Sequence, residues 1–193
     1  SWRVRGMQEW IHHGLGMRVT AFHGRSDGPV ANSDQTQRGA HLSAGKQWQR
    51  IELRGQAGWS DKRFGAQNFY SSLYPDQQEY TRTLLAALEL KHRGLWSWSV
   101  RTYFRQHHDR FELFREGDGY YRFSNGYFIR GEADTARFTP NFFYTFHNVH
   151  RTQVLGAEAE IHRAWKAGTT AIGLHARQED ILSNVLGKKL DGP

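Results

Sequence analysis

Apolar and polar residues alternate one by one along much of this chain, and no other feature limits its fold as strongly. In segment 50–60, Ile51, Leu53 and Trp59 share one side of the pattern, whereas Glu52 lies on the other. A period of two residues is the spacing of a β-strand whose two faces meet different surroundings. Seven further segments alternate in this way: 2–10, 15–23, 39–44, 83–90, 97–105, 155–162 and 170–177. We therefore predict an all-β chain of about eight strands.

One short segment also fits a helix. Leu84, Leu85 and Leu88 would form an apolar stripe at the 3.6-residue period of a helix over Leu84–Leu90. We favour a strand there, because the strands on both sides of this segment need a partner at that place.

The connections between the predicted strands alternate between short and long. Short turns are expected near 12–14, 45–48, 91–95 and 163–168. Long loops are expected near 25–37, 61–80 and 106–148. Tight turns at one end and long loops at the other are typical of outer-membrane β-barrels, which have periplasmic turns and extracellular loops of these two kinds.

Tryptophans gather at the predicted short turns. Five of the seven lie beside them: Trp10, Trp48, Trp96, Trp98 and Trp165. Amphipathic indoles at one end of many strands suggest the aromatic girdle of a transmembrane barrel. Trp48 and Trp59 are eleven residues apart in the sequence. At about 3.3 Å per residue and a tilt of about 45°, they would differ in height by about 25 Å, the height of a barrel's apolar band.

Composition narrows the membrane alternatives. No run of about 18 apolar residues is present, which excludes a transmembrane helix, whereas a barrel strand needs only about 9–11 residues with every second one apolar. The absence of cysteine excludes a disulfide-stapled domain and a thiolate metal site. The net charge of +7 fits nucleic acid, arginines in a wet lumen or anionic lipid headgroups, and composition leaves these open.

Several segments together resemble one family. They are 64–71 (FGAQNFYS), 80–83 (YTRT), 105–115 (RQHHDRFELFR), 150–158 (HRTQVLGAE) and 183–187 (SNVLG). In this order and spacing they look like the middle of the barrel of a TonB-dependent outer-membrane receptor, in the branch similar to vitamin B12 transporters. The resemblance covers roughly residues 40–190. Since both ends of the chain lie within the alternating pattern, we expect residues 1–193 to be an internal part of such a barrel domain, without its plug domain and closing strand.

The resemblance implies a function in uptake. A receptor of this family would sit in the outer membrane of a Gram-negative bacterium and import a scarce large ligand, a corrinoid such as vitamin B12 or a siderophore-like molecule. Its energy would come from TonB, acting through the plug domain. Its implied partners are outer-membrane lipid, the small-molecule ligand, TonB and a possible surface lipoprotein. Two other functions remain open: a small eight-stranded outer-membrane barrel with a structural or adhesion role, and a soluble β-sandwich binding module.

Aromatic residues in the two long loops 61–80 and 106–148 make the candidate ligand site. Rigid amphipathic rings provide contact area at a low entropic cost, while Asn68 and Arg110 would orient polar groups of the ligand. The alternative is packing of one loop on the other over the barrel mouth. The predicted site, at the extracellular rim and away from Trp48 and Trp96, consists of Asn68, Phe69, Tyr70, Tyr74, Asp109, Arg110 and Phe111.

The sequence gives little support to other chemistry. No nucleophile elbow, phosphate-binding loop or dinucleotide motif is present, so we expect neither an enzyme nor a cofactor. Glu158, Glu160 and His162 share one strand face, but we interpret them as a polar lumen wall and expect no metal.

A nucleic-acid groove needs aromatic and basic groups on one face of the sheet. Alternation instead places Phe104 opposite Arg101 and Arg105. We therefore expect no nucleic acid among the partners.

Overall fold

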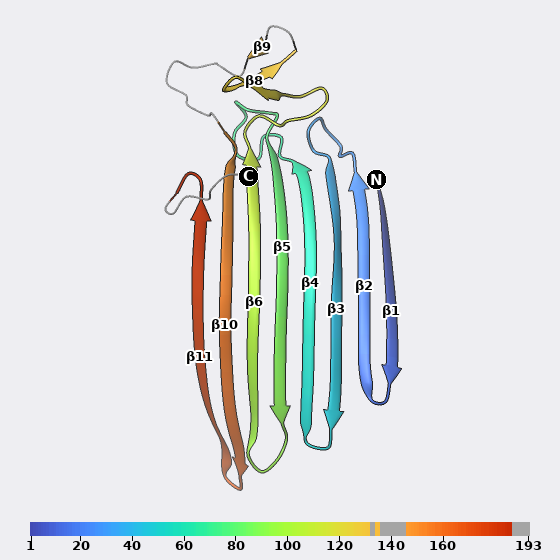
Figure 1. The fold of residues 1–193 in the computed structure, drawn as a ribbon, viewed down its shortest axis with the longest axis vertical. Coiled ribbons are helices and arrows are strands. Elements are labelled where there is room, and N and C mark those ends of the chain that lie inside the picture. The colour runs from blue at the N-terminus through green and yellow to red at the C-terminus, as the bar shows by residue number, and fades with distance from the viewer. Residues whose placement is uncertain (132–133, 136–145, 187–193) are drawn as a thin grey trace.

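The computed structural model describes residues 1–131, 134–135 and 146–186 as one tall antiparallel sheet with a small sheet beyond one end (Figure 1). The order of the tall sheet is β1-β2-β3-β4-β5-β6-β10-β11, so each strand pairs with the next strand of this sheet, and the small sheet lies between β6 and β10 in the sequence. The prediction of about eight antiparallel up-and-down strands is confirmed, including a strand at Leu84–Leu90. The strands are β1 (Trp2–His12), β2 (Leu15–Ser26), β3 (Gln35–Trp48), β4 (Ile51–Gly65), β5 (Gln78–His92), β6 (Ser97–Glu112), β10 (Asn148–Trp165) and β11 (Gly168–Ser183).

Two features of the architecture go beyond the sequence pattern. The small sheet contains β7 (Arg122–Ser124), β8 (Tyr127–Arg130) and β9 (Asp134–Thr135), and the sequence did not predict it. The tall sheet is open in the described residues, because β1 and β11 each pair with one neighbour and form its two edges. Part of the predicted loop 106–148, and Gly187 of the family resemblance, lie outside the described residues.

The strands extend further than the alternation predicted. β3 continues through Gly45–Trp48, which we predicted as a turn, and Gln49 and Arg50 make the turn instead. The segment stays in the sheet because Gly45 pairs with Arg54 and Trp48 with Ile51. At the long-loop end the strands β2 to β6, and β10 by one residue, run into the segments predicted as loops. The connections between the tall strands there therefore shorten to 27–34, 66–77 and 113–147.

The register places the predicted apolar residues of all eight strands on one side. One lateral row reads Leu42, Ala57, Ala86, Phe104 and Leu155, and we call this side the apolar face. The adjacent row on the other side, the polar face, reads Ser43, Gln56, Ala87, Tyr103 and Gly156.

The same register corrects the predicted height of the apolar band. Trp48 lies across from Ile51, so the band along β4 runs from Ile51 to Trp59. Those eight steps span about 26 Å along the strand, or about 19 Å at a tilt of 45°. The prediction of about 25 Å was wrong, because it counted residues across the turn.

The buried apolar core lies outside the tall sheet. The buried hydrophobic side chains among the described residues are those of Ala66, Leu113, Phe114 and Phe128, in the long loops and in β8. Tyr74, Phe111 and Tyr121 pack against the cluster of Leu113, Phe114 and Phe128.

None of the described segments forms a helix of the length and apolarity that crossing a membrane requires.

Candidate functional site

The predicted rim residues lie at the long-loop end of the sheet, opposite the short turns beside Trp48 and Trp96 (Figure 1). Asn68, Phe69, Tyr70 and Tyr74 belong to the loop 66–77, as predicted. Asp109, Arg110 and Phe111 were predicted in the next long loop, and that was wrong: they lie in β6, directly before its last residue, Glu112. The alternation of β6 continues there with polar groups on both faces, which in the sequence looks like a loop.

Three of the predicted aromatic residues form one cluster of rings in contact. The ring centroid of Tyr70 lies 4.7 Å from that of Phe69 and 5.0 Å from that of Phe111, both in edge-to-face geometry. The hydroxyl of Tyr70 donates to Oε2 of Glu79 at 2.6 Å. Burial, together with that hydrogen bond, raises the pKa of Tyr70 to about 12, so its hydroxyl stays protonated. Phe69 and Tyr70 are 72% and 55% exposed, so their rings are open to a ligand.

Neighbouring residues of β6 point to opposite sides of the sheet. Asp109 and Phe111 lie on the polar face, where Asp109 pairs with His150 and its Oδ1 atom is buried without a hydrogen-bond partner. Arg110 lies on the apolar face, with its Nε atom 3.0 Å from Oε1 of Glu112. The prediction placed Asp109 and Arg110 together beside the same ligand. The structure separates them, because a period of two puts consecutive residues on different faces.

The other two predicted residues have structural roles. Asn68 adopts a left-handed conformation, φ 58°, in a turn closed by the amide of Phe69, which donates to the carbonyl of Ala66. Asparagine accepts this conformation more easily than most residues. The ring of Tyr74 packs edge-on against Phe114 at 5.8 Å. For these two residues the geometry matches the alternative of loop packing.

A network that the sequence did not reveal ties the loops together. Arg115 forms two hydrogen bonds with the carboxylate of Asp34, and its Nη1 atom donates to Oδ1 of Asn32 at 2.8 Å. The Nδ2 atom of Asn32 donates to the carbonyls of Pro75 and Gln77. The hydrogen bonds from Arg115 hold the pKa of Asp34 below its usual value. Three connections that are far apart in the sequence thus form one ordered cap. No short sequence motif could have identified this network, because the bonded residues lie 43 to 83 positions apart in the sequence.

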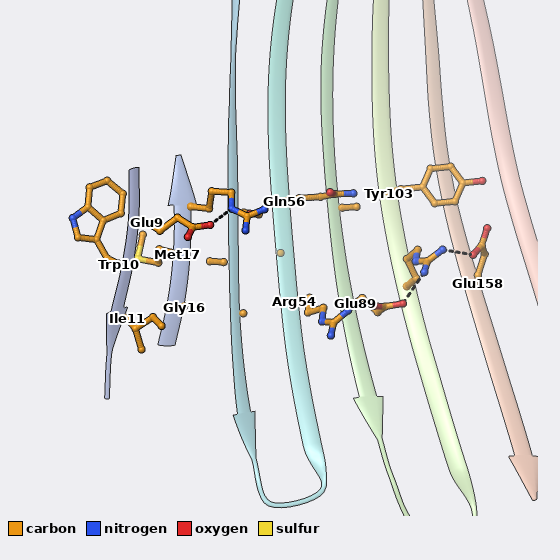
Figure 2. Close-up of a pocket in the computed structure, with 17 residues that line it drawn as sticks. Glu9, Trp10, Ile11, Gly16, Met17, Arg54, Gln56, Glu89, Tyr103 and Glu158 are labelled. Carbon is orange, nitrogen blue, oxygen red and sulfur yellow. Dashed lines mark hydrogen bonds and ion pairs between the residues drawn. The ribbon is translucent and has the colours of Figure 1, made fainter. Parts of the chain in front are cut away.

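The polar face is hollowed lower down, toward the short turns. A cavity of about 1100 Å³ lies against residues of β1, β2, β3, β4, β5, β6 and β10. Figure 2 shows this cavity and the ion pairs that reach Glu9, Glu89 and Glu158. Arg101 bridges Glu89 at 2.7 Å and Glu158 at 3.4 Å. None of the predicted rim residues lines this cavity, so the cavity and the predicted ligand site are separate.

The carboxylates considered for a metal have other partners. Glu158 pairs with Arg101, and Glu160 lies 3.9 Å from Nδ1 of His162. The part of the chain that the structure describes contains no group of three or more His, Cys, Asp or Glu side chains placed to hold a metal ion.

Searches of family models, curated proteins and solved structures found no match to this chain.

Proposed function

We propose that this chain is part of the wall of an outer-membrane β-barrel that imports a large ligand. The observation that carries the proposal is an apolar sheet face with nothing from the described residues covering it. Leu88 is 52% exposed, Leu155 58%, and Leu174 76%. Water-soluble monomers rarely leave an apolar patch of several strands uncovered, whereas contact with lipid chains is favourable for such a face.

The border of the apolar face at the short turns supports a position in a bilayer. Nζ of Lys46 lies 5.4 Å from the ring centroid of Trp48, and the guanidinium of Arg163 lies 3.9 Å from that of Trp165. Indole rings beside cationic groups are typical of the membrane–water boundary, where the ring meets the chains and the cation meets water.

The polar face supports an interior that contains water or a polar plug. Its ion pairs run across several strands, and Arg101 remains 48% exposed while Glu89 beneath it is 13% exposed. A charged, hollowed surface of this width needs hydration or a polar partner. In the proposed receptor, this partner is the plug domain, through which TonB supplies energy.

The rim then has a role in ligand capture. Phe69, Tyr70 and Phe111 present rings in edge-to-face contact at the extracellular end, and Glu79 and Asp109 add carboxylates on the same face. The surroundings of these groups suit a large ligand with both apolar and hydrogen-bonding parts, such as a corrinoid or a siderophore. The proposed location is the outer membrane of a Gram-negative bacterium.

Eight strands also keep a second candidate open, a small closed barrel with a structural or adhesion role. The interior of an eight-stranded barrel is just wide enough for side chains to fill it. The long charged side chains at Arg54, Glu89, Arg101 and Glu158 would crowd such an interior, which favours a wider barrel.

The test uses the whole receptor with cyanocobalamin and a ferric hydroxamate siderophore as probes. The double substitution Tyr70→Ala with Phe111→Ala should weaken binding of one probe by about tenfold or more, the loss of two aromatic contacts of about 1 kcal/mol each. Assembly should be unchanged, because neither side chain takes part in strand pairing. Leu73→Ala is the matched control, since Leu73 lies in the same loop and is 79% exposed. If a probe binds the unmodified receptor and its affinity is unchanged in the double variant, the two rings serve only to pack the loops.

A further inference from the structure

A row of basic side chains crosses the apolar face just beyond its apolar residues, toward the long loops. The strand register aligns these side chains laterally, so they form one line across β2 to β10. The basic row consists of His23, Arg38, Asp61, Arg82, His108 and Arg151. Three arginines and one aspartate give it a formal charge of +3 − 1 = +2 with both histidines neutral.

One carboxylate holds two of the arginines in place. Asp61 lies between Arg38 and Arg82 on the neighbouring strands, with its Oδ2 atom 3.7 Å from Nη2 of Arg38 and 3.1 Å from Nη2 of Arg82. The Asp61 side chain is 9% exposed, whereas those of Arg38 and Arg82 are 56% and 50% exposed. Arg82 donates to Asp61 from Nε and Nη2 and to the hydroxyl of Tyr80 from Nη2. Its Nη1 group stays free to bind a further anion, and so do the donors of Arg38, which comes no nearer than 3.7 Å to Asp61.

The third arginine of the row has no carboxylate partner. Arg151 pairs across the sheet with His108, and no ion pair joins it to an acidic group of the described residues. Its Nε atom is buried without a hydrogen-bond partner. An anion at this height would therefore meet one cation without an ion-pair partner and two that share the carboxylate of Asp61.

The position of the row relative to the apolar band identifies the anion. Ala40, Trp59 and Leu84 lie in the next row on the apolar side, which continues on β6 and β10 with Gln106 and Gln153. The Arg38 guanidinium lies 5.6 Å from the ring centroid of Trp59. A molecule seated here would place apolar chains on the band and its negative group on the arginines. Arginine forks match phosphate geometry, and amphiphiles of this kind are phosphorylated lipids.

We propose that the basic row binds the phosphates of outer-leaflet lipid headgroups. The inference rests on the proposed function, since it requires the apolar face to contact a membrane. The phosphates would lie against Arg38, Arg82 and Arg151, with the acyl chains alongside Leu84 and Ala40. Such contact adds an electrostatic contribution to the binding of lipid at this face, which would otherwise rest on the hydrophobic effect alone.

The test measures binding of lipid A, and of its fully dephosphorylated form, to the whole receptor in neutral detergent micelles. The intact protein should bind lipid A more tightly than the dephosphorylated form. The triple substitution Arg38→Gln, Arg82→Gln and Arg151→Gln should weaken lipid A binding about 100-fold, from about 1 kcal/mol for each cation, and remove the preference for phosphate.

A matched control removes the same charge from the polar face. Arg5→Gln, Lys62→Gln and Arg105→Gln lie at a similar height and should leave lipid A binding unchanged. Equal losses in the two triple variants would overturn the proposal, and so would an equal affinity for lipid A and its dephosphorylated form. If inorganic phosphate alone competes as well as lipid A, the row is a small-anion site and the lipid assignment is wrong. Failure of the proposed function would look different: neither form of lipid would bind at all.

Discussion

The two faces of the tall sheet differ in whether their side chains find partners within the sheet. On the polar face the residues partner one another: Arg101 joins two glutamates, and the hydroxyl of Tyr103 lies 3.0 Å from Nε2 of His175 two strands away. On the apolar face, between the tryptophans and the basic row, side chains such as Leu88 and Leu174 extend outward with no layer over them. The polar face thus joins its charged groups in ion pairs between strands, whereas the apolar face leaves large apolar side chains uncovered by the described residues.

The largest expected effect comes from placing a charge on the apolar face. If the chain forms the proposed barrel wall, Leu53→Arg, Val100→Arg or Leu174→Arg should destabilise that barrel by about 2–4 kcal/mol, because each would place a guanidinium among lipid chains near the bilayer midplane. Gln56→Arg and Ser99→Arg on the polar face should cost much less. The measurement is the free energy of unfolding from refolding into bilayers. Equal costs on the two faces would remove the distinction between them.

Glycines give a smaller contrast between the same two faces. A Cβ atom at Gly39, on the polar face, would lie 2.7 Å from the carbonyl oxygen of Trp59 and 2.8 Å from the ring of Phe22. Gly39→Ala should therefore destabilise the protein by about 1–3 kcal/mol through overpacking. Gly6→Ala on the apolar face meets nothing within 4 Å and should be neutral. Denaturant titration of both variants checks this, and a neutral Gly39→Ala would show that the polar face packs loosely.

The smallest expected effect is local and concerns the cap above both faces. Arg115 lowers the pKa of Asp34 below its ordinary value of 3.8. A depressed carboxyl pKa stabilises the fold above the unfolded pKa, and that contribution disappears as pH falls below about 4 through the folded pKa. Because the chain has no cysteine, a nitroxide on Ser71→Cys reports the mobility of the loop 66–77 alone. Its mobility should rise below about pH 4.

A matched variant distinguishes this cause from general acid unfolding. Asp34→Asn removes the titrating group, so the labelled loop should be mobile at every pH and its response flat. A normal acid response in Asp34→Asn would assign the transition to another carboxylate.

Much of the sheet could be predicted from the sequence, because each strand has one apolar face along its middle. The orientation of β4 is predicted by Ile51, Leu53 and Trp59, and the register confirms it. The prediction failed where that contrast disappears. Around Asp109 both faces are polar, so the end of β6 looked like a loop, and Gly45 with Lys46 looked like a turn although long-range pairing keeps them in β3.

The candidate site could be predicted only in part. The aromatic contact of Tyr70 with Phe111 joins residues that the sequence had already singled out, but their ligand-binding role stays a prediction. Recognising β6 at Asp109 would have separated it from Arg110 by alternation alone. The bond from Arg115 to Asp34 and the basic row depend on pairing between distant segments, and a single sequence contains no local signal for that.

The proposed contact of one face with lipid and of the other with water can be tested directly along β6. Single cysteines from Trp98 to Arg105, each carrying a nitroxide, would be placed in the receptor reconstituted in bilayers. Collision rates with oxygen, which concentrates in lipid, and with a water-soluble nickel complex would then be recorded at each position. We expect a period of two, with oxygen favoured at Trp98, Val100, Thr102 and Phe104 and nickel at Ser99, Arg101, Tyr103 and Arg105. Rates without alternation, or nickel access on both faces, would contradict a membrane-spanning sheet.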